Sequence, residues 1–335
     1  MSLLVRAPLP GDGVALSRLW KELWDAHEAW GGYPGAKDLR VYDEVAERIE
    51  GDAYIRGGQP SLGRHVHLVA VKDETVVGQV EGWLERYGHL ATTPVTCEVR
   101  SLVVHSKARG AGIGRALLEA LASTAAQFGR GSPIVLAAEV LEANPARTFY
   151  ERAFYSTVAW TARMSTQLGP LSSVEWRARK AIVDDALALA RCEGILADRR
   201  RERGDRRFDP PRALEASFVE SIARYLRDKR PDASEWVIER RGRGVVGSAT
   251  LVLSRLDPPF LAGYRATLAR VVLEPESTEP DALATLVVAA AREAACRGAR
   301  TMEIADLPGP HSSLQDAAIA LGADPWSRVM SRVVE

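Results

Sequence analysis

Gly110, Gly112 and Gly114 lie close together in the segment SKARGAGIGRALLEALA, residues 106–122. The β-branched run CEVRSLVVH precedes them, and alanines and leucines at helical spacing follow, so the order is strand, loop, helix. The first N–H groups of a helix have no intrahelical partner and lie at the positive end of the helix dipole. This arrangement predicts a site for a phosphate or pyrophosphate, to which Arg109 adds a positive charge.

The spacing separates three kinds of phosphate loop. A P-loop requires Gly-Lys-Ser/Thr, but Arg115 and Ala116 follow the last glycine. A dinucleotide fingerprint requires G-x-G-x-x-G in a first βαβ unit, whereas this pattern is G-x-G-x-G far along the chain. The third pattern, Arg109-x-x-Gly112-x-Gly114, resembles the acetyl-coenzyme A pyrophosphate loop of the GCN5-related N-acetyltransferases (GNATs). An ordinary glycine-rich turn before a core helix is the alternative.

Further residues extend the resemblance over Leu4 to about Met164. The segment SPIVLAAEVLEANPARTFYERAFY contains Asn144 and Tyr150 in the family's order, with Ala153 where glycine is common. Glu98 lies where several members carry a general base. The resemblance implies an α/β (α+β) fold with a mixed, mostly antiparallel central sheet flanked by helices. It also implies acetyl-coenzyme A as co-substrate, bound by Leu102, Val103, Val104, Arg109, Gly110, Ala111, Gly112, Ile113, Gly114, Arg115 and Asn144.

The resemblance also implies the chemistry. Glu98 would accept the amine proton, directly or through water, and Tyr150 would donate a proton to the departing thiolate. Glu98 as a charged residue on a strand face, solvent as the base, and Tyr150 as a packing residue are the alternatives. Successive strand residues face opposite sides, so Cys97 points away if Glu98 points into the site, which favours direct transfer over an acetyl-cysteine.

The N-terminal segment is expected to bind the acceptor, a small-molecule or peptide amine. Trp20 and Trp24 are four residues apart on one helix face, so we expect them to pack in the core. Trp30 and Tyr33 lie among glycines and a proline, and they are the candidate substrate contacts.

The second half of the chain repeats the first at an offset of 169 residues. Val77-Gly78 then falls on Val246-Gly247, and the helix sequence ALLEALA falls on TLVVAAA. We therefore expect two tandem GNAT-like domains, residues 1–166 and 172–335. At this offset Thr278, Glu279, Asp281 and Leu283 replace the phosphate loop, Thr267 replaces Glu98, and Ile319 replaces Tyr150. The second domain is expected to be non-catalytic and to support the first.

Composition limits the remaining possibilities. The 335 residues carry 44 basic and 44 acidic side chains, which does not favour nucleic acid or a membrane as partner. With no signal peptide or apolar span, we expect a cytoplasmic protein whose three cysteines are reduced. No metal is expected, and we assign His65 and His67 to an edge strand. The mixed-charge run ADRRRERGDRRFDPP is expected to be a solvated helix end and loop. An acyl-coenzyme A sensor without turnover is the alternative function, and the oligomeric state is not predicted.

Overall fold

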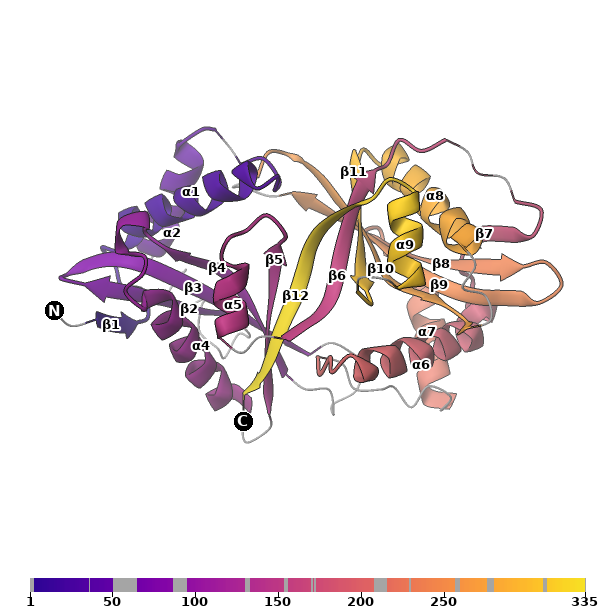
Figure 1. Cartoon of the computed structure of the whole chain (residues 1–335), viewed down its shortest axis with the longest axis horizontal. Coiled ribbons are helices and arrows are strands. Elements are labelled where there is room, and N and C mark those ends of the chain that lie inside the picture. The colour runs from indigo at the N-terminus through magenta and orange to yellow at the C-terminus, as the bar shows by residue number, and fades with distance from the viewer. Residues whose placement is uncertain are drawn as a thin grey trace. The chain divides into compact units, whose positions relative to one another are not determined.

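The computed structural model describes the chain except for residues 1–2, 36, 51–64, 87–94, 130–132, 154–155, 170, 172, 208–215, 229, 257–259, 276–279, 310–311 and 335. The chain forms two compact units (Figure 1). Unit 1 comprises Met1–Ser156, Asp257–Leu261 and Met330–Glu335. Unit 2 comprises Thr157–Leu256 and Ala262–Val329.

Unit 1 is built on five strands in the order β1-β2-β3-β4-β5, all antiparallel except the parallel pair β4 and β5. In chain order the elements are β1 (Leu3–Arg6), α1 (Gly13–Ala29), α2 (Arg40–Glu50), β2 (His65–Lys72), β3 (Thr75–Arg86), β4 (Val95–Val104), the short 3₁₀ helix η2 (Ser106–Ala108), α4 (Ile113–Gly129), β5 (Ile134–Leu141) and α5 (Arg147–Arg152).

The two faces of this sheet bury different cores. Alternate β2 residues Val66, Leu68 and Ala70 lie in one core cluster with the apolar side of α4. Val69 and Val71 lie in a second cluster with the apolar side of α1. The sheet is thus covered by α4 on one face and by α1 on the other (Figure 1).

Unit 2 repeats this plan with strands in the order β6-β11-β10-β9-β8-β7. Only β10 and β11 are parallel. The elements are β6 (Ser156–Ser165), β7 (Trp176–Lys180), the 3₁₀ helix η3 (Val183–Asp185), α6 (Ala186–Glu202), α7 (Ala216–Arg227), β8 (Ala233–Arg240), β9 (Gly244–Leu256), β10 (Gly263–Leu273), α8 (Pro280–Cys296), β11 (Thr301–Leu307), α9 (Ser313–Ala320) and β12 (Asp324–Val334).

The strand register confirms the internal repeat. Gly78 pairs with Val104, and 169 residues further along Gly247 pairs with Leu273. A Cβ on Gly78 would lie 3.0 Å from the carbonyl oxygen of Val103, and one on Gly247 would lie 2.5 Å from that of Val272. The matched Val-Gly pairs therefore reflect a close backbone approach that both copies share.

The two copies exchange their last strands. β6 pairs with β11 inside unit 2, although it ends the first sequence repeat. The end of β12 belongs to unit 1, where Met330 is fully buried in the cluster formed around α4 and β5. The compact units therefore differ from the ranges 1–166 and 172–335 by this exchange and by the segment Asp257–Leu261, which belongs to unit 1.

Candidate active site

The parallel pair β4 and β5 separates part-way along its length. Register partners run from Val95 with Ile134 to Glu98 with Ala137, and β4 then continues to Val104 without a described partner on β5. A bulge opposite Gln79 and Glu81 bends β4 at this point, and Ser101 adopts a φ of +49°. The β5-facing edge of residues 99–104 is thus available to pair with an extended ligand.

The glycine loop follows directly from the end of β4. Gly110 and Gly112 have φ values of +83° and +77°, and a Cβ on either would meet no heavy atom within 4 Å. Gly114 lies in the first turn of α4, behind the buried Ile113. Gly110, Ala111, Gly112 and Arg115 are exposed, so the loop and the α4 N-terminus form an open, cationic surface.

Arg109 links this loop to β4 and to α1. Its Nε donates to the Val104 carbonyl oxygen at 2.9 Å, and its Nη2 donates to Glu22 Oε1 at 2.9 Å. The same Glu22 oxygen accepts from the Ser106 N–H at 3.0 Å. Sequence reasoning missed Glu22, because a contact across 87 residues leaves no local pattern.

A line of polar side chains lies on the α1 side of β2, β3 and β4. His65 Nε2 lies 2.9 Å from Glu81 Oε1, and His67 Nε2 lies 3.1 Å from Gln79 Oε1. β2 pairs with both β1 and β3, so the assignment of these histidines to an edge strand is wrong. They are buried because their polar atoms find partners on β3.

Glu98 lies at one end of this polar line. Arg100 donates to Glu98 Oε2 through Nε at 3.0 Å and through Nη2 at 2.5 Å, and its guanidinium lies 5.5 Å from the Trp83 ring centroid. Cys97 lies in the opposite core, where burial raises its pKa to about 12. The predicted alternation of Cys97 and Glu98 is confirmed, and Cys97 is a buried thiol rather than a nucleophile.

Two further titratable groups in this line, Glu81 and His67, have shifted pKa values. Burial would raise the pKa of Glu81, but hydrogen bonds with His65 and Ser101 and the proximity of His67 lower it to about 2. Burial lowers the pKa of His67. An ionised Glu81 next to a neutral His67 therefore lies beside the bulge.

Asn144 and Tyr150 come from the segment after β5. Asn144 Oδ1 accepts from the Ala146 N–H at 2.8 Å, which shapes the turn before α5 and leaves the amide NH₂ for another contact. Tyr150 is buried in the α4-side cluster, with its ring 5.3 Å from that of Phe149, and burial raises its pKa. Glu98 and Tyr150 thus lie on opposite sides of the sheet, and the described register of β4 with β5 ends at Glu98.

Aromatic rings form a wall near the end of α1. Trp20 is buried in the α1-side core, as predicted, whereas Trp24 is only partly buried. The ring centroids of Trp24 and His27 are 5.3 Å apart, and those of His27 and Trp30 are 5.5 Å apart. Tyr33 reaches this wall through Phe260, a residue missed by sequence reasoning.

Phe260 belongs to the second sequence repeat and to unit 1. Its ring lies 4.7 Å from Trp24 and 6.2 Å from Tyr33. Its backbone forms a bridge with Gly35, and the N–H of Leu261 donates to the Pro34 carbonyl oxygen at 3.0 Å. Phe260, between β9 and β10, therefore completes the aromatic wall beside Trp24 and Tyr33.

The second copy has different groups at the equivalent places. Leu273, the counterpart of Val104, accepts a hydrogen bond at 2.7 Å from Arg199 on α6 rather than from a loop arginine. α8 begins at Pro280 with Asp281 exposed in its first turn, and Leu283 is buried. Thr278 and Glu279 lie outside the described residues.

One sequence expectation about the second copy is wrong in part. Within residues 197–207, Asp198, Arg201, Glu202 and Arg206 are exposed as expected, but Arg200, Asp205 and Arg207 are buried. Residues 208–211 lie outside the described residues. Asp205 from within the run pairs with Arg207, and Asp306 of β11 pairs with Arg200 and Arg207, which permits the burial of these arginines.

The comparisons with known proteins agree with this geometry. The acetyltransferase (GNAT) domain family matches residues 63–154, which contain the divided strand pair, the bulge and the glycine loop. Residues 63–154 are a GNAT domain. No curated protein sequence matches the chain.

Solved structures extend the GNAT fold over both units. A GCN5-related N-acetyltransferase from Sphaerobacter thermophilus is 16% identical with a TM-score of 0.59, over 99% of this chain and 95% of its own. A tandem GNAT protein from the clavulanic acid biosynthesis pathway, determined without AcCoA, is 19% identical with a TM-score of 0.51, over 99% and 98%. The predicted tandem fold is confirmed.

Two further properties apply to the described part of the chain. Within it we find no helix that has both the length and the apolar character needed to cross a bilayer. Nor do His, Cys, Asp and Glu side chains gather there in a group of three or more suited to hold a metal ion.

Proposed function

We propose that the chain is an acetyl-coenzyme A-dependent N-acetyltransferase whose active site is in unit 1 and whose second copy is non-catalytic. The observation that carries this proposal is the course of β4. The strand leaves β5 after Glu98, and its last carbonyl oxygen, on Val104, holds Arg109 of the glycine loop. One strand therefore supports both an anion site and a free backbone edge beside a carboxylate.

The residues of this strand and loop have distinct roles. The α4 N-terminus and Arg109 would hold the pyrophosphate, and Leu102 to Val104 would pair through their backbone with the pantetheine arm. A backbone N–H in this stretch would stabilise the oxyanion that forms as the amine attacks the thioester carbon. Asn144 would contribute its amide NH₂ to the coenzyme.

Proton transfer falls to two side chains on opposite sides of the sheet. Glu98 would accept the proton of the attacking amine, while Arg100 fixes the orientation of its carboxylate. Tyr150 would protonate the thiolate, since its raised pKa keeps the phenol protonated at neutral pH. The acceptor amine would lie on the polar face, against a wall that includes Trp30 and Tyr33.

The proposal is tested by binding and turnover in the full-length protein. We expect titration calorimetry to show acetyl-coenzyme A binding that Gly112→Glu weakens at least about 100-fold, because the new carboxylate repels the pyrophosphate. Gly242→Glu is the matched control, since Gly242 has a φ of +79° and equally open surroundings in the β8–β9 hairpin. Absence of binding to the wild type would refute the proposal.

A second function has one observation in its favour. Tyr150 is buried in an apolar cluster, where a phenol can serve packing alone. The chain would then bind an acyl-coenzyme A without turnover and act as a sensor. Thiol release measured over a broad panel of amines separates the two functions, because only the enzyme gives amine-dependent release.

A further inference from the structure

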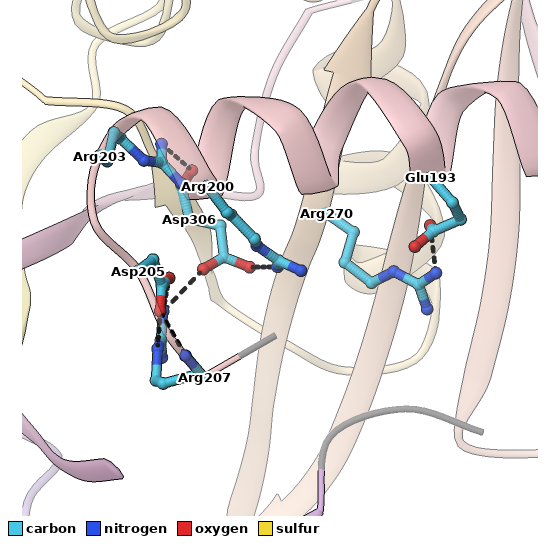
Figure 2. Close-up of polar contacts among 7 residues, drawn as sticks. All are labelled: Glu193, Arg200, Arg203, Asp205, Arg207, Arg270 and Asp306. Atoms are coloured by element: carbon cyan, nitrogen blue, oxygen red, sulfur yellow. Dashed lines mark hydrogen bonds and ion pairs between the residues drawn. The ribbon is translucent and has the colours of Figure 1, made fainter. Parts of the chain in front are cut away.

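Unit 2 contains a group of buried charges that the proposed transfer reaction does not use. They gather at the C-terminal end of α6 and at the carboxyl end of β11, which is parallel to β10 (Figure 2). In sheets of this kind, ligands often bind beyond the carboxyl ends of parallel strands. The residues, here called the arginine cluster, are Arg200, Arg203, Asp205, Arg207 and Asp306.

Two of the three arginines are held by the carboxylates. Arg200 Nη2 lies 2.5 Å from Asp306 Oδ2, and Arg207 donates to Asp205 through Nε at 2.9 Å and Nη2 at 2.8 Å. Arg207 also lies 3.5 Å from Asp306 Oδ1. Burial would raise the pKa of Asp306, but Arg200, Arg207 and Arg203 lower it to about 2, so this carboxylate is ionised.

Arg203 differs from the other two. Its Nη1 contacts only the Asp306 carbonyl oxygen, at 3.4 Å. Its Nε and Nη2 are buried and have no hydrogen-bond partner. These two nitrogens form the edge of a guanidinium that binds a carboxylate through two parallel hydrogen bonds.

The two carboxylates of the cluster are engaged by other arginines. Asp306 pairs with Arg200 and Asp205 pairs with Arg207, while the Nε–Nη2 edge of Arg203 has no hydrogen-bond partner. A buried charge without a partner is costly, and the burial lowers the pKa of Arg203. The next residue, Gly204, has a φ of +72° with no heavy atom within 4 Å of a Cβ position, so this turn has free space on one side.

We propose that the arginine cluster of unit 2 is a binding site for a carboxylate group of a small-molecule ligand, received by the Nε–Nη2 edge of Arg203. The two parallel donors of this edge match the two oxygens of a carboxylate, which favours a carboxylate as the ligand group. The second copy would thus keep a ligand site while lacking the residues for transfer. This inference does not depend on catalysis in unit 1.

The test measures thermal unfolding of the full-length protein in sodium acetate, sodium succinate and sodium phosphate, with ionic strength held constant by sodium chloride. We expect a saturable rise in melting temperature of about 5 °C with a carboxylate, as ligand linkage predicts near saturation. Arg203→Gln should abolish the rise. Without added anion its melting temperature should equal or exceed that of the wild type, because the unpaired charge is gone.

Matched variants separate a binding site from a general salt effect. Arg201→Gln removes an exposed arginine two residues away, paired with Asp198, and should keep the full response. Arg203→Lys keeps the charge but lacks the two-donor edge, and calorimetry should show carboxylate affinity at least about 10-fold weaker. An equal response in Arg203→Gln and wild type, stabilisation by phosphate alone, or no anion effect would each overturn the proposal.

Discussion

Trp20 and Glu193 are the eighth residues of α1 and α6, and each lies against the bulged strand of its own copy. In the first copy, Trp20 Nε1 donates to Ser101 Oγ at 3.3 Å. In the second copy, Glu193 forms an ion pair with Arg270, the residue 169 positions after Ser101. Both bulge residues have a positive φ, +49° and +57°. The backbone geometry is thus shared, while the chemistry around it is not.

The difference extends along both sheets. His67 and Glu81 are register partners in the first copy, and Glu235 and Thr250 are register partners in the second. In the first copy, a Cβ on Gly110 or Gly112 of the glycine loop would have no heavy atom within 4 Å. In the second copy, Arg199 of α6 donates a hydrogen bond to the carbonyl oxygen of Leu273 at the end of β10. The packing of a helix against a bulged strand is therefore retained in both copies, while the side chains at the ligand site differ.

The largest expected effect concerns the assignment of turnover to the first copy. Tyr150→Phe keeps the ring but removes the proton donor, so kcat should fall roughly 100-fold or more with acetyl-coenzyme A affinity unchanged. The matched variant in the second copy is Ile319→Ala, at a position that is 47% exposed. Its kcat should equal that of the wild type. A Tyr150→Phe enzyme with normal kcat would return Tyr150 to a packing role.

Acid unfolding contrasts the two bulge networks. The pKa of Glu81 is lowered from 4.5 to about 2, so its contribution to stability is present above pH 4.5 and is lost as the pH falls towards 2. Burial raises the pKa of Glu235, so protonation of Glu235 favours the folded state as the pH falls through that raised value. The network around Glu81 should therefore lose stability in acid, whereas the network around Glu235 should not.

Urea unfolding at pH 6 and pH 3 checks this contrast. Between these two pH values Glu81→Gln should remove acid sensitivity on the order of 2 kcal/mol, because a carboxylate with a pKa of about 2 keeps part of its linkage contribution at pH 3. Glu235→Gln should remove the stability that protonation of Glu235 adds as the pH falls. If both variants keep the wild-type dependence on pH, the two networks do not differ in charge as described.

A smaller effect is expected from the aromatic wall. Phe260→Ala removes the ring between Trp24 and Tyr33, so kcat/KM for the acceptor should fall about 10-fold while acetyl-coenzyme A affinity is retained. Leu261→Ala is the control, because Leu261 is 47% exposed and is held through its backbone N–H. Equal acceptor profiles for both variants, in an enzyme that turns over, would exclude Phe260 from the acceptor site.

The smallest effect should come from Glu98. Glu98→Gln removes a base but keeps the shape of the side chain, so turnover should fall a few-fold at pH 8 and about 10-fold at pH 6.5, where more amine is protonated. The counterpart Thr267 lies in a copy expected to be inactive, so Thr267→Val should leave the pH–rate profile unchanged. If Glu98→Gln keeps the wild-type pH–rate profile, solvent rather than Glu98 accepts the proton of the attacking amine.

Local patterns in the sequence were enough to predict the strand, loop and helix around Gly112 and the repeat at 169 residues. Both rest on residue spacing, and the register and the solved GNAT structures confirm them. The roles of Glu98, Asn144 and Tyr150 remain proposals.

Long-range pairing was not predictable in the same way. The roles of Glu22, Phe260 and the arginine cluster depend on contacts between distant segments. The composition of the run predicted that Arg200 and Arg207 are exposed, but both are buried. Their charges suggested solvent, but Asp205 and Asp306 compensate them in the interior. A mixed-charge run can thus become buried when its partners are within reach in the fold.

The exchange of last strands affects how the chain can fold as it is synthesised. Residues up to Ser156 leave the ribosome about 170 residues before Met330, which completes their core. At roughly 5–20 residues per second this is a delay of about 10–30 s, during which the cluster around α4 and β5 lacks its last strand. The N-terminal unit should therefore reach its native state only after Met330 has been synthesised, and until then it should be a substrate for chaperones.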